Sequence, residues 1–366
     1  MLKYLGSKRT LVPLIAELAA ALPLRSACDL FAGTTRVGQA LRRGGLEVHS
    51  NDLATYSREL GRAYIEAEDG ERADASELLG GLSSLPGRRG YFTRTFCEDS
   101  RYFQPHNGER IDAIRDAIEA AGLTPAVRGL LLTSLMEAAD RVDSTTGVQM
   151  AYLKRWAPRA AKALELRLPE AVEGPRGTVT RRDANELAPE LEVDLVYIDP
   201  PYNQHSYFAN YHIWETLTRW DAPEAYGIAR KREDCRARKS AYNSKVQAGP
   251  VLDELLNRLR APWLIVSFNN EGFHEPGHVR AMLSEHGYVG SLEVDFKRYV
   301  GAQIGIHNPR GEKVGAVSHL RNKELLFLVG PDRGLIERAL ERVGASREAP
   351  RRAAASARMQ GALPPA

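Results

Sequence analysis

Residues 195–202 read Leu-Val-Tyr-Ile-Asp-Pro-Pro-Tyr, and they decide the fold class of this chain. The four apolar residues predict a strand buried on both faces, as in a parallel sheet, which the prolines end. Open α/β sheets bind ligands at the carboxyl ends of such strands, where Asp199 stands. The Asp199 carboxylate and the carbonyls of Pro200 and Pro201 can accept hydrogen bonds from an amino group. Tyr202 offers a face to a planar ring, so the motif predicts a cradle for a nucleobase with an exocyclic amine.

A second motif lies upstream, in residues 26–41, which pass from a strand through a glycine turn into a helix. Gly33 allows the backbone to approach a ligand closely, and Thr34 or Thr35 can cap the helix. The turn lacks the Gly-x-Gly-x-x-Gly fingerprint, which disfavours a dehydrogenase. Taken alone, residues 199–202 could equally be a strand end followed by a turn. The glycine turn upstream favours the functional interpretation.

Together the two motifs resemble those of the amino-group DNA methyltransferases, which use S-adenosylmethionine and make N6-methyladenine. In that family Asp-Pro-Pro-Tyr is the catalytic motif, which implies catalytic roles for Asp199, Pro200, Pro201 and Tyr202. Residues 29–33, Asp-Leu-Phe-Ala-Gly, resemble the family's cofactor-binding turn, although many relatives carry Gly or Ser at the position of Thr35. Residues 3–8, Lys-Tyr-Leu-Gly-Ser-Lys, resemble the N-terminal motif that closes over the methionine end of the cofactor.

Two further acids complete the expected cofactor site. Asp52 ends a second predicted strand about 20 residues after the glycine turn, where an acid can bind both ribose hydroxyls. Asp183 ends a third predicted strand, and the resemblance implies a hydrogen bond to the adenine amine of the cofactor. Either acid could instead simply cap the helix that follows it. The other cofactor-binding residues that the resemblance implies are Tyr4, Gly6, Lys8, Asp29, Phe31, Ala32, Gly33, Thr34, Thr35 and Asp199.

The expected reaction is methyl transfer to an amine that is a poor nucleophile, because its lone pair is delocalised into the base. Hydrogen bonds to Asp199 and the Pro200 carbonyl would localise that lone pair, and the target base must leave the duplex to reach them. Cytosine-N4 enzymes usually carry Ser where Asp199 stands, and RNA enzymes often carry Asn, so Asp favours DNA adenine. Cytosine-N4 or RNA adenine methylation, or a non-catalytic DNA-binding protein with this fold, remain the alternatives.

The strand and helix patterns predict an α/β fold: a Rossmann-like class I methyltransferase sheet with an inserted, mostly helical domain. The S-adenosylmethionine-binding catalytic domain is expected to be discontinuous, in residues 1–55 and 175–330, with antiparallel last strands. Residues 56–174 form the insert. The motif order resembles the one called alpha in this family, which implies that the insert, between the cofactor and catalytic halves, is the target-recognition domain. Within it, residues 103–115 and 138–156 resemble segments of restriction-modification adenine methylases. Residues 331–366 begin with one short predicted helical stretch, 335–343, but few bulky apolar side chains follow it, so we expect a largely disordered tail.

The densest cluster of positive charge follows the catalytic loop, where a phosphate backbone must pass if a base enters the cradle. The predicted DNA-binding residues are Lys231, Arg232, Arg236, Arg238, Lys239 and Lys245. Arginine outnumbers lysine 40 to 10, so a generic Arg-rich surface is the alternative. Tyr202 is expected to stack on the extruded base, and Tyr207 or Phe208 to cover it from the other side. Trp214 fits a helix core, and Tyr299 could line the same pocket.

Composition limits the class of protein. The net charge is +3, which permits a nucleic-acid partner through a local patch without requiring one. Cys28, Cys97 and Cys235 are not spaced as a disulfide framework or a zinc site, so we expect a reducing cytosol and no metal. No signal peptide or membrane-length apolar run is visible. We therefore expect a cytoplasmic, monomeric protein acting on double-stranded DNA, with a cognate restriction endonuclease as a candidate partner.

Overall fold

Seven strands form the central sheet, in the order β3-β2-β1-β4-β7-β9-β8. The computed structural model describes the chain except for residues 1, 5–7, 270–271, 298–320 and 361–366. The strands are β1 (Ser26–Asp29), β2 (Glu47–Asn51), β3 (Thr178–Thr180), β4 (Leu195–Ile198), β7 (Trp263–Asn269), β8 (Tyr288–Lys297) and β9 (Arg321–Gly330). Strands β1 to β4 and β7 are parallel, whereas β9 runs antiparallel to both β7 and β8. The predicted α/β sheet with antiparallel last strands is therefore confirmed.

The switch in strand order lies between β1 and β4. From β1 the sheet extends to β2 and β3 on one side, and to β4 and β7 on the other. The carboxyl ends of β1 and β4 therefore border a crevice, which is where open α/β sheets bind their ligands. Asp29 ends β1, and Asp199 directly follows β4. The fold brings to one edge two acids that are 170 positions apart in the sequence.

Each face of the sheet packs against its own layer of helices. Alternate residues of each strand point to opposite faces, so Ala27 and Tyr197 join one apolar core while Cys28 and Val196 join the other. The first core includes residues of α1 (Val12–Ala20), α2 (Arg36–Arg43) and α14 (Arg333–Gln360). The second includes residues of α8 (Ala184–Leu187), α11 (Ala248–Arg258) and α12 (Pro276–Ser284).

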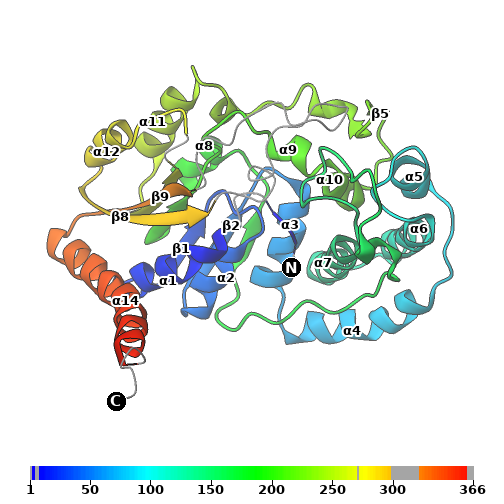
Figure 1. The fold of residues 1–366 in the computed structure, drawn as a ribbon, viewed down its shortest axis with the longest axis horizontal. Helices are drawn as coiled ribbons and strands as arrows, with labels where there is room; N and C mark the ends of the chain where they lie inside the picture. The colour runs from blue at the N-terminus through cyan, green and yellow to red at the C-terminus, as the bar shows by residue number, and fades with distance from the viewer. Residues whose placement is uncertain (1, 5–7, 270–271, 298–320, 361–366) are drawn as a thin grey trace, which may run out of the picture.

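A helical lobe lies beside the sheet, on the right in Figure 1. Its helices from the predicted insert are α3 (Thr55–Gly61), α4 (Asp69–Ser84), α5 (Tyr91–Thr93), α6 (Pro105–Ala120) and α7 (Pro125–Val142). A further helix, α10 (His212–Arg219), comes from after the catalytic loop. Tyr211, Ile213, Trp214 and Leu217 all belong to the same apolar core as α6 and α7. The lobe is thus wider than residues 56–174, and Trp214 is the core residue that was predicted.

Smaller elements connect these layers. The short helix α9 (Tyr207–Asn210) precedes α10. A two-stranded hairpin of β5 (Ala225–Tyr226) and β6 (Lys231–Arg232) follows α10. Short 3₁₀ turns lie at Lys8–Thr10, Pro158–Ala161, Ala188–Glu190, Glu233–Cys235 and Ala241–Asn243, and π-helical turns at Arg62–Glu66 and Arg94–Glu98. No helix among the described residues has the length and apolar character needed to cross a membrane.

The C-terminal segment corrects one expectation. We expected a largely disordered tail, but α14 is helical over Arg333–Gln360. Ile336, Ala339 and Val343 are buried against the sheet layer that α1 also covers. These apolar residues recur at helical spacing, so they form a narrow stripe even though the segment as a whole is poor in apolar residues. The expected helical stretch 335–343 therefore forms part of α14, which continues to residue 360.

Candidate functional site

A cavity of about 710 Å³ opens at the carboxyl edge of the parallel strands. It unites most of the residues that the sequence assigned separately to the cofactor and to catalysis. Those that line it are Tyr4, Lys8, Asp29, Phe31, Ala32, Gly33, Thr34, Asp52, Asp183, Asp199 and Pro201. Pro200, Tyr202 and Thr35 are not among its described lining residues, and Gly6 lies outside the described part of the chain.

The glycine turn after β1 has the backbone geometry that a closely bound ligand requires. Gly33 has φ +51°, and a Cβ at this position would lie 3.3 Å from the Tyr4 ring. Thr35 also has a left-handed backbone, with φ 60°, a conformation that glycine adopts more easily than threonine. The Thr35 side chain is fully buried, and its hydroxyl accepts a hydrogen bond from the Gln39 amide at 3.0 Å. Thr35 therefore shapes the turn but does not reach the cavity, contrary to its assignment as a cofactor contact.

Three acids at the strand ends are held by backbone N–H groups. Asp29 accepts from Gly38 N at 2.8 Å, and burial raises its pKa to about 7. Asp52 accepts from Gly33 N and from Ala54 N, each at 2.8 Å, and burial raises its pKa. Asp183 caps α8 by accepting from Asn185 N at 2.9 Å. Asp183 therefore caps a helix, as the alternative interpretation predicted, and it also lines the cavity.

The Asp199 carboxylate, which the sequence predicts to be catalytic, belongs to a largely buried group of charges. Lys8 Nζ lies 3.0 Å from Asp199 Oδ1 and 3.3 Å from Glu324 Oε2. Glu324 also accepts a hydrogen bond from the Asn269 amide at 3.0 Å, through its other oxygen. Burial raises the pKa of Asp199 to about 6; Lys8 opposes the rise and Glu324 adds to it. Glu324 escaped prediction because it follows Arg321 and Lys323 at the start of an apolar strand pattern, where a charged residue is ordinary.

Aromatic side chains form one wall of the cavity. The Tyr4 ring stacks on Tyr211, with centroids 4.3 Å apart, and on Tyr207 at 5.5 Å. Tyr207 and Phe208 line the cavity. The Tyr202 ring instead lies 5.6 Å from the Phe268 ring, beneath the Lys8 ammonium. Tyr207 and Phe208 are therefore better placed than Tyr202 to stack on a base. Tyr299 lies outside the described residues.

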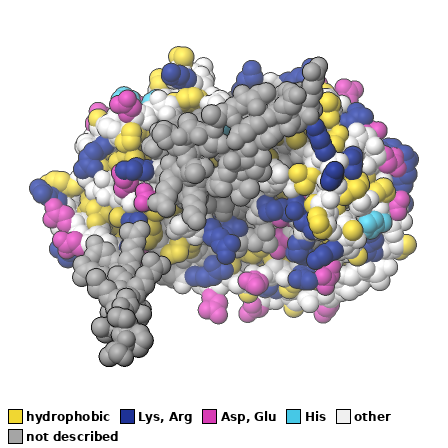
Figure 2. All heavy atoms as spheres, in the orientation of Figure 1, with side chains coloured by type: hydrophobic (Ala, Val, Ile, Leu, Met, Phe, Trp, Pro, Cys, Tyr) yellow, Lys and Arg dark blue, Asp and Glu magenta, His cyan; other side chains and the backbone are white. Residues whose placement is uncertain are grey.

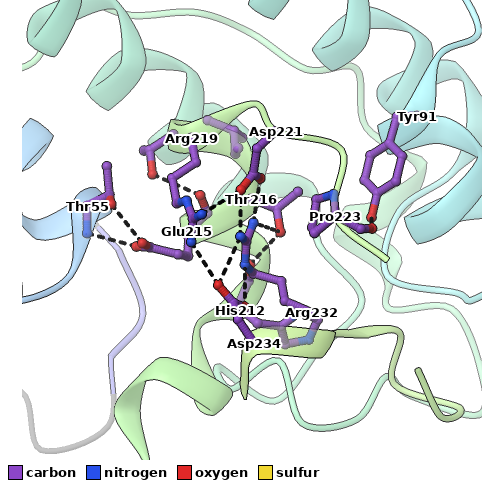
Figure 3. Close-up of polar contacts among 12 residues, drawn as sticks. Thr55, Tyr91, His212, Glu215, Thr216, Arg219, Asp221, Pro223, Arg232 and Asp234 are labelled. Atoms are coloured by element: carbon purple, nitrogen blue, oxygen red, sulfur yellow. Dashed lines mark hydrogen bonds and ion pairs between the residues drawn. The ribbon is translucent and has the colours of Figure 1, made fainter. Parts of the chain in front are cut away.

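The basic segment after the catalytic loop divides into two parts. Arg238 and Lys239 line the cavity, while Arg236 and Lys245 are exposed and Lys231 is partly buried in β6. Arg232 is different, since only 1% of its surface is exposed. It makes two 2.7 Å contacts with Asp221 and one of 3.0 Å with Asp234 (Figure 3). The DNA-binding assignment of Arg232 was therefore wrong, because its guanidinium is already used inside the fold.

Arg36 is a cavity residue that the sequence analysis did not single out. It is the first residue of α2, directly after the glycine turn, and it lines the cavity. Its Nε is buried and finds no hydrogen-bond partner among the described residues. A cation with an open donor can bind a carboxylate, and acids at strand ends can bind hydroxyl and amino groups. The cavity thus fits a ligand with an amino-acid end and a nucleoside end, as in S-adenosylmethionine.

Comparison with known proteins decides between the possible families. A family model described as D12 class N6 adenine-specific DNA methyltransferase matches residues 4–282, which include both motifs and the whole helical insert. The chain belongs to this family. It is an adenine-specific DNA methyltransferase that uses S-adenosylmethionine, as the two motifs predicted. Cytosine-N4 and RNA methylation and a non-catalytic role are the less favoured alternatives.

Individual relatives agree with the family. The methyltransferase is 32% identical over 305 residues to the type II methyltransferase M.NlaIII of Neisseria lactamica, covering 81% of this chain and 90% of that protein. It is 31% identical over 327 residues to the modification methylase StsI of Streptococcus sanguinis, covering 83% of this chain but 50% of that protein. M.CviAII of Paramecium bursaria Chlorella virus 1 is 29% identical over 283 residues, covering 74% of this chain and 83% of that protein. The chain thus spans nearly all of one relative and about half of another.

Proposed function

We propose that this methyltransferase methylates N6 of an adenine extruded from double-stranded DNA and held against Asp199. One observation carries the proposal: a single cavity joins Asp199 to the acids at the ends of β1 and β2 and to Asp183. A site for methyl transfer needs the amine and the methyl donor in one enclosed space, because positioning supplies much of the rate enhancement.

In the proposed binding mode, different residues of the cavity contact the two ends of the cofactor. Asp52 binds the ribose hydroxyls and Asp183 the adenine amine, while Arg36 binds the carboxylate of the methionine end. Tyr4 covers Gly33 and closes the turn over that end. S-adenosylmethionine supplies an electrophilic methyl group on sulfur when it is bound.

The catalytic half holds the target amine. Asp199 accepts a hydrogen bond from the N6 amine, and this favours a nitrogen whose lone pair points toward the methyl donor. Lys8 contacts Oδ1 of this carboxylate at 3.0 Å, and a carboxylate has enough acceptor sites to bind Lys8 and the amine together. Glu324, 3.3 Å from the Lys8 ammonium, adds a second negative charge that neutralises it.

The base reaches this position by leaving the duplex. Extrusion costs a few kcal/mol, which stacking on aromatic side chains offsets. Tyr207 and Phe208 supply that stacking surface, and the exposed Arg238 and Lys239 contact the phosphate backbone at the cavity mouth. The helical lobe reads the recognition sequence.

The similar proteins support a cellular role. M.NlaIII is named a type II methyltransferase and StsI a modification methylase. We therefore propose that the methyltransferase protects DNA from a cognate restriction endonuclease, acting as a monomer in the cytoplasm. Sequencing DNA from an expressing host with detection of modified bases would reveal the target sequence, and unmodified adenine throughout would refute the proposal.

Two substitutions test the assignment of the site. Asp199→Ala should lower kcat about a thousandfold or more, since it removes the group that holds the amine. Its affinity for S-adenosylmethionine, measured by calorimetry, should stay close to the wild-type value. Asp52→Ala should do the reverse and weaken cofactor binding about tenfold or more, because a charged hydrogen bond is lost. Near-normal transfer of labelled methyl groups by Asp199→Ala would show that the catalytic loop has been misassigned.

A further inference from the structure

The β5–β6 hairpin is anchored at its base by one buried arginine. Arg232 ends β6, and its guanidinium makes bidentate contacts with Asp221 and a further contact with Asp234 (Figure 3). Its Nη1 also lies 3.3 Å from the Thr216 hydroxyl on α10. Breaking a buried arrangement of this kind is costly, because the charges left behind are unpaired. The base of the hairpin is therefore fixed to the helical lobe.

The turn of the hairpin is held as well. Ala229 O accepts a hydrogen bond from the Tyr102 hydroxyl at 3.1 Å, and Arg230 forms an ion pair with Asp99 at 3.0 Å. Gly227 and Arg230 have positive φ values of 67° and 49°, which close the turn. A hairpin fixed at its base and its turn loses little conformational entropy when it binds a partner.

Ile228 stands at the tip of this rigid hairpin with 82% of its surface exposed. Val246, at 84%, is similarly exposed, and the next large apolar side chain among the described residues is Leu53, at 58%. Single exposed apolar residues are ordinary. Here, however, the two most exposed ones flank the basic segment that leads to the cavity. Because Ile228 is held exposed by a rigid hairpin, we infer that its exposure is functional.

Stacked cations connect the hairpin to the cavity. The Arg236 guanidinium lies over the Tyr226 ring of β5 at 4.2 Å, and that of Arg238 over the Phe208 ring at 4.8 Å. Phe208 and Arg238 line the cavity itself. Across the face shown in Figure 2, Lys and Arg side chains are dispersed among acidic ones, so the surface as a whole does not mark a DNA-binding site. The positions of Arg236 and Arg238 are more informative, because they place positive charge between the hairpin and the site of the target base.

We propose that the β5–β6 hairpin is a DNA wedge, which inserts Ile228 between bases of the duplex beside the extruded adenine. The inference rests on the proposed function and adds an element to it. Apolar side chains that enter a base step unstack it, and this lowers the cost of removing a neighbouring base. The cations beside the hairpin supply the attraction to phosphate, and Ile228 supplies the apolar contact.

Salt dependence separates a wedge from a phosphate contact. Ile228→Ala should weaken duplex binding about tenfold at every salt concentration, because burial of an apolar side chain is lost. The slope of log affinity against log salt should not change, since no counterions are involved. Arg236→Ala should reduce that slope by about one. Ile228→Leu should bind like the wild type.

One further measurement and a control variant complete the test. Duplex DNA with 2-aminopurine at the target position should fluoresce more on binding wild-type protein, and markedly less with Ile228→Ala. Tyr288→Ala is the matched control, since Tyr288 is 55% exposed but pairs with Gly330 near the amino end of β7, on the side of the sheet away from the cavity. Unchanged affinity and fluorescence in Ile228→Ala, or a changed salt slope, would overturn the wedge. Failure of the wild type to methylate DNA would instead refute the proposed function.

Discussion

The surroundings of Asp199 disfavour the ionised form of its carboxyl group. Burial raises its pKa to about 6, the Lys8 ammonium lowers it and the Glu324 carboxylate raises it. The ionised form is the better hydrogen-bond acceptor for an amine. Because this pKa is raised, the active form is lost as the pH falls through about 6, and kcat measured at saturating substrates should decline there.

Substitution of the two neighbours should move this decline in opposite directions. Lys8→Met removes the cation that favours the carboxylate, so the acidic limb of kcat should move up by about one pH unit or more. Glu324→Gln removes a negative charge, so the limb should move down. Each profile is measured by transfer of labelled methyl groups at saturating cofactor. Equal shifts of the same sign would contradict the arrangement of charges, because a general loss of packing would act on both variants alike.

Sequence patterns identified those site residues whose position follows from the strand or turn next to them in the sequence. Asp199 and Asp52 could be placed because each follows a recognisable strand, and Gly33 because it interrupts a strand-to-helix pattern. Glu324 and the role of Arg232 could not, since each is defined by partners from other segments. A buried arginine and a phosphate-binding arginine look the same in a sequence, and only the position of Asp221 distinguishes them.

At the scale of elements, α4 and α6 offer a matched comparison, because both contain 16 residues and internal glycines. A Cβ at Gly108 in α6 would lie 2.3 Å from Cys97 Sγ, whereas a Cβ at Gly80 in α4 would meet nothing within 4 Å. Gly108→Ala should therefore lower the free energy of unfolding by about 1–3 kcal/mol. Gly80→Ala should raise it by about 0.5–1 kcal/mol, through helix propensity alone. Urea unfolding measures both, and a stabilised Gly108→Ala protein would show that the contact is looser than the structure indicates.

Elements were predictable in proportion to their length and regularity. The helix α7 has local signals in its apolar spacing and its Thr124 cap, and β7 has one in the apolar run with which it begins. The β5–β6 hairpin has only two residues in each strand, too few for an alternating pattern to be visible. Its shape depends on ion pairs with Asp99, Asp221 and Asp234, which are tertiary contacts.

At the scale of the whole molecule, the helical lobe is built from two separate parts of the chain. Trp214 and its neighbours on α10 fill the core that α6 and α7 enclose. A fragment of residues 56–174 would lack them and leave a cavity the size of several large side chains, at a cost of about 3–5 kcal/mol for the Trp alone. We expect this fragment to keep helical circular dichroism but to unfold without a sharp transition. Cooperative unfolding like that of the full chain would show that the insert is an independent domain.

The catalytic loop joins two bodies. Ile198 is the last residue of β4 and pairs with β7 inside the sheet, and the Tyr211 ring is buried in the core of the helical lobe. The twelve positions between them, which include Asp199, form a short segment with both ends embedded. A shift of the helical lobe on gripping the double helix is therefore expected to displace the Asp199 carboxylate relative to the nucleoside bound at the sheet.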